Sequence, residues 1–82
     1  MRMVTIRLFG PIRENCGQGR IIVEAGTMRE VMRLAMQQGV DEKLFARAVM
    51  FVNGQAVVGA KRWALRLRDG DEIVLLSPVG GG

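Results

Sequence analysis

The stretch TMREVMRLAMQ at positions 27–37 decides the fold, because it carries the clearest helix signal in this chain of 82 residues. Thr27 and Glu30 have the spacing of a capping box, in which each side chain accepts a free backbone N–H of the first helical turn. The apolar residues that recur at helical spacing are Met28, Val31, Met32 and Ala35. Gly39 then supplies a stop. We therefore expect one helix that packs its apolar stripe on a sheet; a methionine-rich surface for a partner is the less favoured interpretation.

Two strands are predicted before this helix. Residues 3–9 alternate between inward apolar and outward positions, as in a half-buried strand, and a Gly-Pro pair ends the pattern. Residues 12–17 leave room for one helical turn or a loop. Residues 21–24 are rich in β-branched side chains, so they should form a second strand that pairs with the first as a hairpin.

A second hairpin is predicted after the helix. Asp41 is expected to cap a further short turn, and residues 48–52 form a strongly apolar run that we assign to the centre of the sheet. Asn53 and Gly54 both tolerate positive φ, which favours a type I′ turn. Residues 55–58 should therefore return antiparallel to the apolar run.

The last part of the chain adds one more strand. Residues 59–63 resemble a surface crossover, residues 65–68 alternate leucine with arginine along a strand, and Asp69-Gly70 turns the chain into a final strand at residues 73–76. The order β-β-α-β-β, with short insertions, predicts an α+β protein of the β-grasp type. Its mixed sheet of four to five strands would pack on one main helix.

The composition fits a single small domain. We expect this domain to span residues 1–78 and a flexible glycine tail to span residues 79–82. A chain of this size buries only about 60–65% of its unfolded surface. No apolar run approaches the roughly 20 residues that a membrane span needs, and the first residues lead into a strand pattern rather than a signal peptide. The expected location is cytoplasmic, with no membrane partner.

Residue types exclude several kinds of site. Cys16 is the only cysteine and histidine is absent, which excludes zinc clusters and Cys/His or Ser/His catalytic pairs. Cys16 is expected to be a small packing residue. The net charge of +4 would suit an acidic protein partner or nucleic acid.

The end of the chain resembles a known family. Residues 68–82, RDGDEIVLLSPVGGG, look like the acidic turn, apolar strand, Pro-Val and terminal Gly-Gly of the ubiquitin-like sulfur carriers of the MoaD and ThiS type. Residues 11–14, PIRE, are similar to the loop after the first strand in molybdopterin-synthase small subunits. One departure is the sequence LLSP at residues 75–78, where those subunits usually carry aromatic residues and two prolines.

The resemblance implies a specific chemistry at Gly82. An adenylating, ubiquitin-activating-like enzyme would use ATP and Mg²⁺ to join AMP to the terminal carboxylate, and sulfur from a cysteine desulfurase or rhodanese would displace AMP to leave a thiocarboxylate. A molybdopterin-synthase large subunit would then receive the sulfur. This chain would bind no cofactor or metal itself and would act as a non-catalytic small subunit or co-substrate.

The tail suits this role on physical grounds. A free carboxylate is a poor acyl donor, so the activating site must surround it with cations and exclude water. Gly80 and Gly81 would form the thin thread that enters such a site, while Pro78 would separate the ordered strand from the tail. Residues 79–82, extended at about 3.3–3.6 Å each, would reach roughly 13–14 Å.

Other functions and surfaces stay open. The sulfur could feed thiamine thiazole or cysteine synthesis, the adenylate could pass to lysine amines as in a ubiquitin-like modifier, or the chain could be a basic RNA-binding domain. The third is disfavoured because few aromatic residues are present to stack on bases, so we expect no nucleic-acid partner. Candidates for an exposed apolar docking patch are Phe9, Phe51, Leu75, Ser77, Pro78 and Val79. Arg66 and Arg68, on a strand face near Arg62, would either dock an acidic surface or keep that face solvated.

Overall fold

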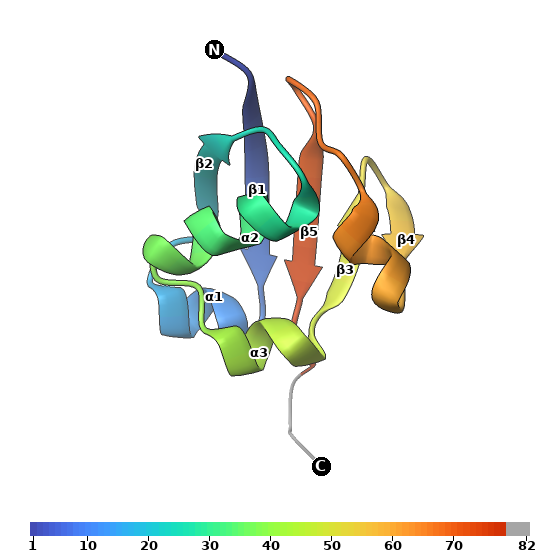
Figure 1. The fold of residues 1–82 in the computed structure, drawn as a ribbon. Helices are drawn as coiled ribbons and strands as arrows, with labels where there is room; N and C mark the ends of the chain where they lie inside the picture. Colours follow the sequence, from blue (N-terminus) through green and yellow to red (C-terminus); the bar gives the residue numbers. More distant parts are fainter. Residues whose placement is uncertain (79–82) are drawn as a thin grey trace.

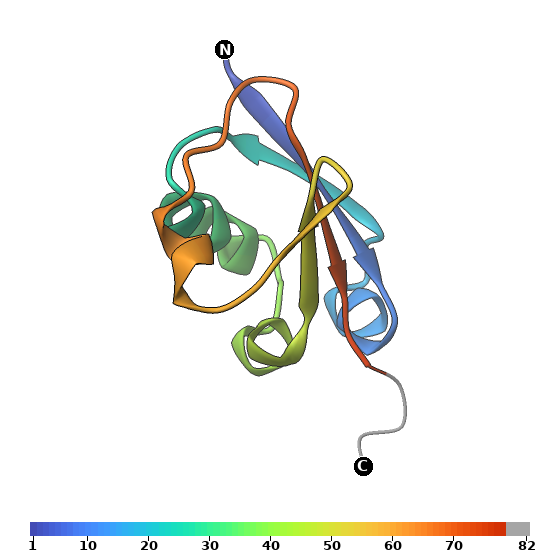
Figure 2. The same cartoon turned by 90° about the vertical axis from the view of Figure 1, so that its right-hand side faces the viewer.

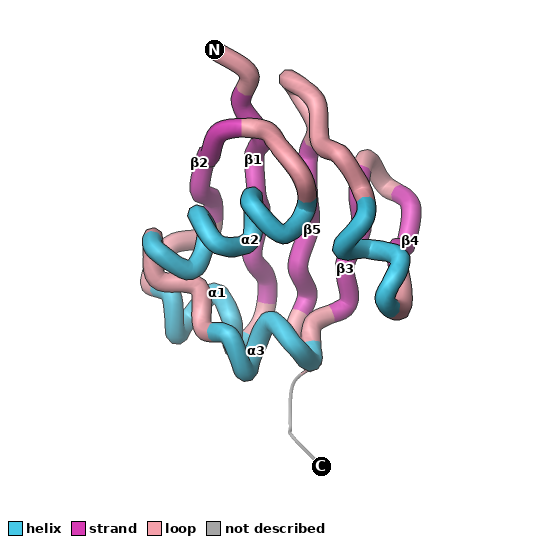
Figure 3. Tube along the Cα trace, in the orientation of Figure 1, coloured by secondary structure: helices cyan, strands magenta, loops and turns pink. Residues whose placement is uncertain are grey.

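The computed structural model describes residues 1–78, which form one mixed sheet with helices on it (Figures 1 and 3). The elements in chain order are β1 (Met3–Phe9), α1 (Pro11–Cys16), β2 (Arg20–Glu24), α2 (Met28–Gln37), α3 (Glu42–Arg47), β3 (Val49–Val52), β4 (Gln55–Val57), the 3-10 helix η1 (Ala60–Ala64) and β5 (Glu72–Leu76). Within residues 1–78, no helix has the length and apolar character to span a membrane.

The sheet has five strands in the order β2-β1-β5-β3-β4. The last strand, β5, lies at its centre, parallel to β1 on one side and antiparallel to β3 on the other. The expectation that the apolar run at residues 48–52 is central is therefore wrong. β3 is an inner strand between β5 and β4, and of its side chains only Met50 is fully buried. Its other apolar residues belong partly to the outer face of the sheet.

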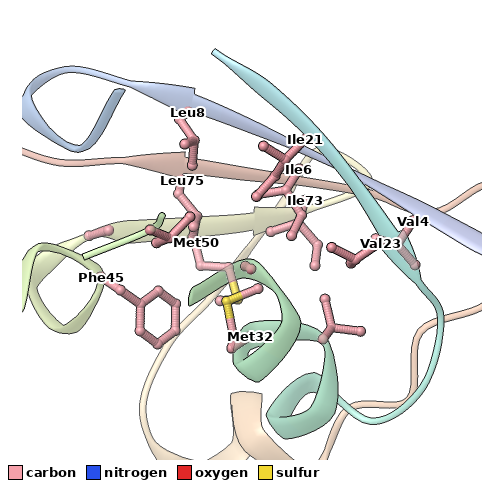
Figure 4. Packing of buried hydrophobic residues seen from close by; sticks show 14 of the residues in the cluster. Val4, Ile6, Leu8, Ile21, Val23, Met32, Phe45, Met50, Ile73 and Leu75 are labelled. Carbon is pink, nitrogen blue, oxygen red and sulfur yellow. The ribbon is translucent and has the colours of Figure 1, made fainter. Parts of the chain in front are cut away.

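The core lies between the sheet and α2 (Figure 4). Every second residue of the inner strands points into it, and α2 adds the predicted stripe. The fully buried members from β1, β5 and α2 are Val4, Ile6, Leu8, Ile73, Leu75, Met28, Val31, Met32 and Ala35. Figure 2 shows α2, α3 and η1 on the same side of the sheet, so the sheet has a covered inner face and an outer face.

The signals at the two ends of α2 are confirmed. The backbone N–H of Glu30 donates to Thr27 Oγ1 at 3.2 Å and the backbone N–H of Thr27 donates to Glu30 Oε1 at 2.9 Å. These bonds from the backbone and side chain of Thr27 hold the pKa of Glu30 below its ordinary value, and the charges of Arg66 and Arg33 act in the same direction. The helix ends at Gln37, and Gly39 follows with φ 112°.

The second hairpin also forms as predicted. Asn53 and Gly54 have φ angles of 50° and 83°, and β3 and β4 pair antiparallel across them. Asp41 caps α3 by accepting the backbone N–H of Leu44 at 2.9 Å. The crossover predicted at residues 59–63 forms most of η1, which extends to Ala64.

The strand expected at residues 65–68 does not form. This segment runs beside the start of α2: the backbone N–H of Met28 donates to the carbonyl of Leu65 at 2.8 Å, and that of Leu67 donates to the carbonyl of Gly26 at 2.7 Å. The segment also forms an isolated β-bridge between Arg66 and Thr27. The segment is therefore hydrogen-bonded to the loop before α2 and to the first residue of α2, rather than to a strand of the sheet.

Candidate functional site

β5 brings the end of the chain to one edge of the molecule. It is held on both sides, since Leu76 lies opposite Phe9 of β1 and opposite Val49 of β3. The chain leaves the sheet at the lower end of Figure 1, near α1 and α3. Val79, Gly80, Gly81 and Gly82 lie outside the described residues, so their predicted roles stay predictions.

Ser77 anchors the point where the chain leaves the sheet. Its side chain is 1% exposed. Its Oγ accepts the backbone N–H of Ile12 at 2.8 Å and lies 3.5 Å from the carbonyl oxygen of Phe9, while its own backbone N–H donates to that carbonyl at 3.1 Å. The expectation that Ser77 lines an exposed patch is therefore wrong. Because buried polar groups need partners, Ser77 instead ties the end of β5 to the first turn of α1.

The departure from a double proline has a structural explanation here. A proline at position 77 would have neither the N–H that bonds to Phe9 nor the hydroxyl that accepts from Ile12. The partners of these two bonds are 65 residues apart for Ile12 and 68 for Phe9. Ser77 thus fixes the start of the tail by tertiary hydrogen bonds, and the exposed Pro78 follows it directly.

Gly10 completes this anchor, although the sequence analysis gave it no site role. A Cβ at Gly10 would lie 2.6 Å from the backbone oxygen of Ser77, and Gly10 has φ +85°. Both facts require glycine, since L side chains avoid this φ and no Cβ fits at that distance. The Gly-Pro pair after β1 was the available signal, but it indicated only a stop. We call Gly10, Ile12 and Ser77 the tail anchor.

The exposed apolar residues near the tail lie on the outer face of the sheet. Phe9, Leu76 and Val49 stand side by side across β1, β5 and β3 and are 41%, 44% and 42% exposed. In the next row, half-buried Val74 and Phe51 lie opposite each other. We call these five residues the outer patch. Exposed apolar residues gathered in this way are typical of interaction surfaces.

Two of the predicted docking residues, Phe9 and Phe51, thus belong to the outer patch. Leu75 does not: it is fully buried, because alternation along β5 points it at α2. The sequence analysis missed Val49, Val74 and Leu76. Both faces of β5 are apolar in sequence, so the pattern could not tell which one the helix covers.

Arg66 and Arg68 are exposed but lie elsewhere. They precede the turn that enters β5 at the upper end of Figure 1, whereas β5 ends at the lower end. That turn is structural: Asp69 Oδ1 accepts the backbone N–H of Met3 at 2.9 Å and Asp71 Oδ2 accepts that of Arg68 at 2.7 Å. The two arginines therefore share neither a strand face nor the outer patch.

Cys16 has the expected packing position. It is partly buried against the core, and its Sγ lies 3.9 Å from the carbonyl oxygen of Gln38.

Comparison with known proteins extends over nearly the whole chain. The family model described as the ThiS family matches residues 6–82. A subunit in the complex of subunits 1 and 2 of the molybdopterin-converting factor of Helicobacter pylori is 26% identical, with TM-score 0.72 and coverage of 98% of this chain and 99% of that one. No curated protein matches the sequence at a significant level.

Modifier proteins share the fold as well. The small archaeal modifier protein 1 of Methanosarcina acetivorans is 25% identical, with TM-score 0.78 over 100% of this chain and 98% of that chain. The one of Haloferax volcanii reaches TM-score 0.80 at 20% identity over 98% and 99%, which is a likeness of fold alone. The β-grasp prediction is confirmed, and the chain belongs to the ThiS family.

Proposed function

We propose that this protein is a sulfur carrier that works as the small subunit of a molybdopterin synthase in the cytoplasm. The observation that carries the proposal is the match to the ThiS family through residue 82, together with 26% identity to a molybdopterin-converting factor subunit that is seen in complex with its second subunit. The anchored exit of β5 supports it, because a tail that starts at a fixed point can be aimed into a partner's site.

The proposed chemistry takes place at the carboxylate of Gly82. A carboxylate oxygen attacks the α-phosphorus of ATP, and pyrophosphate leaves, which gives an acyl adenylate. A sulfur nucleophile then attacks the acyl carbon; the new C–S bond forms as the bond to the AMP oxygen breaks, and AMP leaves with that electron pair. With sulfide as the nucleophile, loss of its remaining proton gives the thiocarboxylate.

In this proposal the chain supplies binding rather than catalysis. The outer patch docks the activating enzyme and later the large subunit, with Pro78 and Val79 between the patch and the glycines. Phe9, Leu76 and Val49 are the contacts with the greatest exposed apolar area, so they should contribute most to affinity. Gly80 and Gly81 thread the partner's site without side chains that could clash.

The test is the intact mass of the protein after incubation with a MoaD-activating enzyme, ATP, Mg²⁺ and sulfide. We expect the intact mass to rise by the difference between one sulfur atom and one oxygen atom, and to do so only when ATP is present. A chain that lacks Gly81 and Gly82 is the control and should gain nothing. An unchanged mass, with an enzyme that loads its own carrier in the same buffer, would refute the carrier role.

A protein modifier is the second candidate, because the chain is 25% identical to a small archaeal modifier protein over its full length. The same adenylate would pass to a lysine amine, with loss of AMP and formation of an isopeptide bond. Expression of the tagged protein in the source cells, followed by mass spectrometry of captured conjugates, separates the two. Conjugates that disappear with Gly81 and Gly82 deleted would favour the modifier.

A further inference from the structure

A groove lies on the helix side of the molecule, away from the outer patch. It runs between α2, α3 and η1, which Figure 2 places on one side of the sheet, and it has a volume of about 660 Å³. Its lining combines apolar and aromatic side chains with arginines; the ones that matter here are Arg29, Arg33, Met36, Phe45, Arg62 and Trp63. We call this the helix-side groove.

The aromatic floor of the groove holds two of the arginines in place. The rings of Phe45 and Trp63 meet edge to face with centroids 5.4 Å apart. The guanidinium carbon of Arg29 lies 5.2 Å from the Trp63 centroid, and that of Arg62 lies 5.1 Å from the Phe45 centroid. Stacking of this kind orders a guanidinium group while leaving its N–H donors available to an anion.

The charges at the groove are unbalanced. Arg29, Arg33 and Arg62 line it, against a single acidic residue, Glu42. Arg33 also acts on Glu30 at the start of α2. Among residues 1–78, the ion pair that forms joins Arg7 to Glu72 on the strands, so none of the groove arginines is neutralised in that way. The groove therefore has a positive rim over an apolar floor.

Trp63 packs partly against the core and leaves the rest of its surface to the groove. It is the only tryptophan in the chain and contacts the core cluster, yet it is only half-buried and η1 has no fully buried residue. Tryptophan and arginine are among the residue types enriched where side chains dominate binding at protein interfaces. The exposed part of Trp63 beside the groove arginines therefore suits a binding function.

We propose that the helix-side groove binds an acidic segment of a protein partner that carries a bulky apolar side chain. The apolar side chain would lie against Met36 and Trp63, above the buried ring of Phe45, and carboxylates beside it would pair with the arginines. The surface is independent of the tail chemistry. Because the groove and the outer patch lie on opposite sides of the sheet, one partner can hold the carrier by the groove while another engages the outer patch and the tail.

The same features favour a protein over a nucleic acid. Binding of single strands uses a series of aromatic faces on which successive bases stack, whereas the aromatic residues of the groove are a single pair, Phe45 and Trp63, whose rings meet edge to face. An apolar floor suits a leucine or phenylalanine side chain rather than a sugar-phosphate backbone.

Trp63 provides the experiment, since it is the only tryptophan and reports directly on the groove. The probe is a synthetic helical peptide with leucine on one face and glutamate on the others, titrated into the full chain while tryptophan emission is recorded. We expect a saturable blue shift. A peptide with lysine in place of glutamate, and one with serine in place of leucine, should each bind at least about tenfold more weakly.

Matched charge reversals locate the site. Arg62→Glu should weaken binding of the acidic peptide by about tenfold or more, whereas Arg2→Glu, which changes the net charge equally at a remote exposed position, should change it less than about twofold. Arg29→Gln is a milder second variant in case Arg62→Glu unfolds, as checked by circular dichroism. The proposal would be overturned if both reversals weakened binding of the acidic peptide equally. It would also be overturned if an RNA oligonucleotide caused the same blue shift and bound with the same affinity as the peptide. A chain without residues 80–82 should bind the peptide unchanged, so this result is separable from the carrier test.

Discussion

The two faces of the five-residue strand β5 (Glu72–Leu76) have different roles. Ile73, Leu75 and then Ser77 point inward, where they are buried against α2 and α1. Val74 and Leu76 point outward, beside Phe9 and Val49. The inward residues hold the fold and fix where the tail begins, whereas the outward residues remain for a partner. Substitutions of neighbouring residues should therefore separate stability from binding.

The largest effect is expected at Leu75. Its side chain is fully buried in the centre of the sheet, so Leu75→Ala should lower the free energy of unfolding by about 2–5 kcal/mol through lost burial and a residual cavity. Leu76→Ala is the matched control on the next residue and should change it by less than about 1 kcal/mol, because the side chain is already 44% exposed. Urea denaturation followed by circular dichroism measures both. Equal losses would contradict the division of β5 into two faces.

The second-largest loss of folding stability is expected from substitutions in the tail anchor. Ser77→Ala removes the acceptor of the Ile12 N–H in a buried place, which should cost about 1–3 kcal/mol. Gly10→Ala should be at least as harmful, because its Cβ would lie 2.6 Å from a backbone oxygen at a positive φ. Gly54→Ala, at a positive φ but in open space, is the control for the φ effect alone. If Gly10→Ala costs no more than Gly54→Ala, the close contact with Ser77 is not important.

Substitutions in the outer patch should weaken binding of the activating enzyme while changing folding stability little. Leu76→Glu should leave the urea midpoint nearly unchanged but weaken the complex with the activating enzyme by about tenfold or more, since a charge would replace a central apolar contact. Isothermal titration calorimetry gives the affinity. Ile22→Glu, an equally exposed apolar position on the edge strand β2, is the control and should bind normally.

The smallest effect is expected at Glu30. Its pKa is lowered in the folded state by the hydrogen bonds with Thr27, so the ionised form stabilises the fold above the unfolded pKa, and this contribution is lost as the pH falls through the folded pKa. Thr27→Ala removes the hydroxyl that donates to Glu30 Oε1 but keeps the backbone N–H that donates to the same oxygen, so it should move that pKa only part of the way toward its ordinary value, as an NMR titration of the Glu30 carboxyl group would show. An unchanged pKa would mean that the hydroxyl bond is not one of its causes.

Local signals predicted most of the fold. The capping box at Thr27 and Glu30, the Asn53-Gly54 turn and the alternation of β1 each depend on residues close in the chain, and all three are confirmed. The β-grasp order followed from them. The predicted central position of residues 48–52 was wrong because an apolar run shows only that both faces of a strand carry apolar side chains and does not fix its place in the strand order. The outer side chains of β3 here form part of the outer patch.

The site was harder to predict because it depends on contacts between distant segments. Ser77 and Ile12 are 65 residues apart, and no spacing rule links them. Residues 65–68 alternate as a strand does, yet their hydrogen bonds go to the loop before α2. Positions 75 and 76 are both leucine, so residue type does not distinguish them, and only the position of α2 decides which one is buried. The chemistry at Gly82 was inferred from the resemblance rather than from any pattern.

The measurement that tests the central claim most directly is the rate at which the intact protein gains sulfur from sulfide, ATP and the activating enzyme, compared among three chains. The unaltered protein should accumulate the heavier species, Leu76→Glu should do so more slowly at low enzyme concentration and recover at high concentration, and the chain without Gly81 and Gly82 should never do so. Sulfur gained by the truncated chain, or none gained by the unaltered protein, would contradict the account.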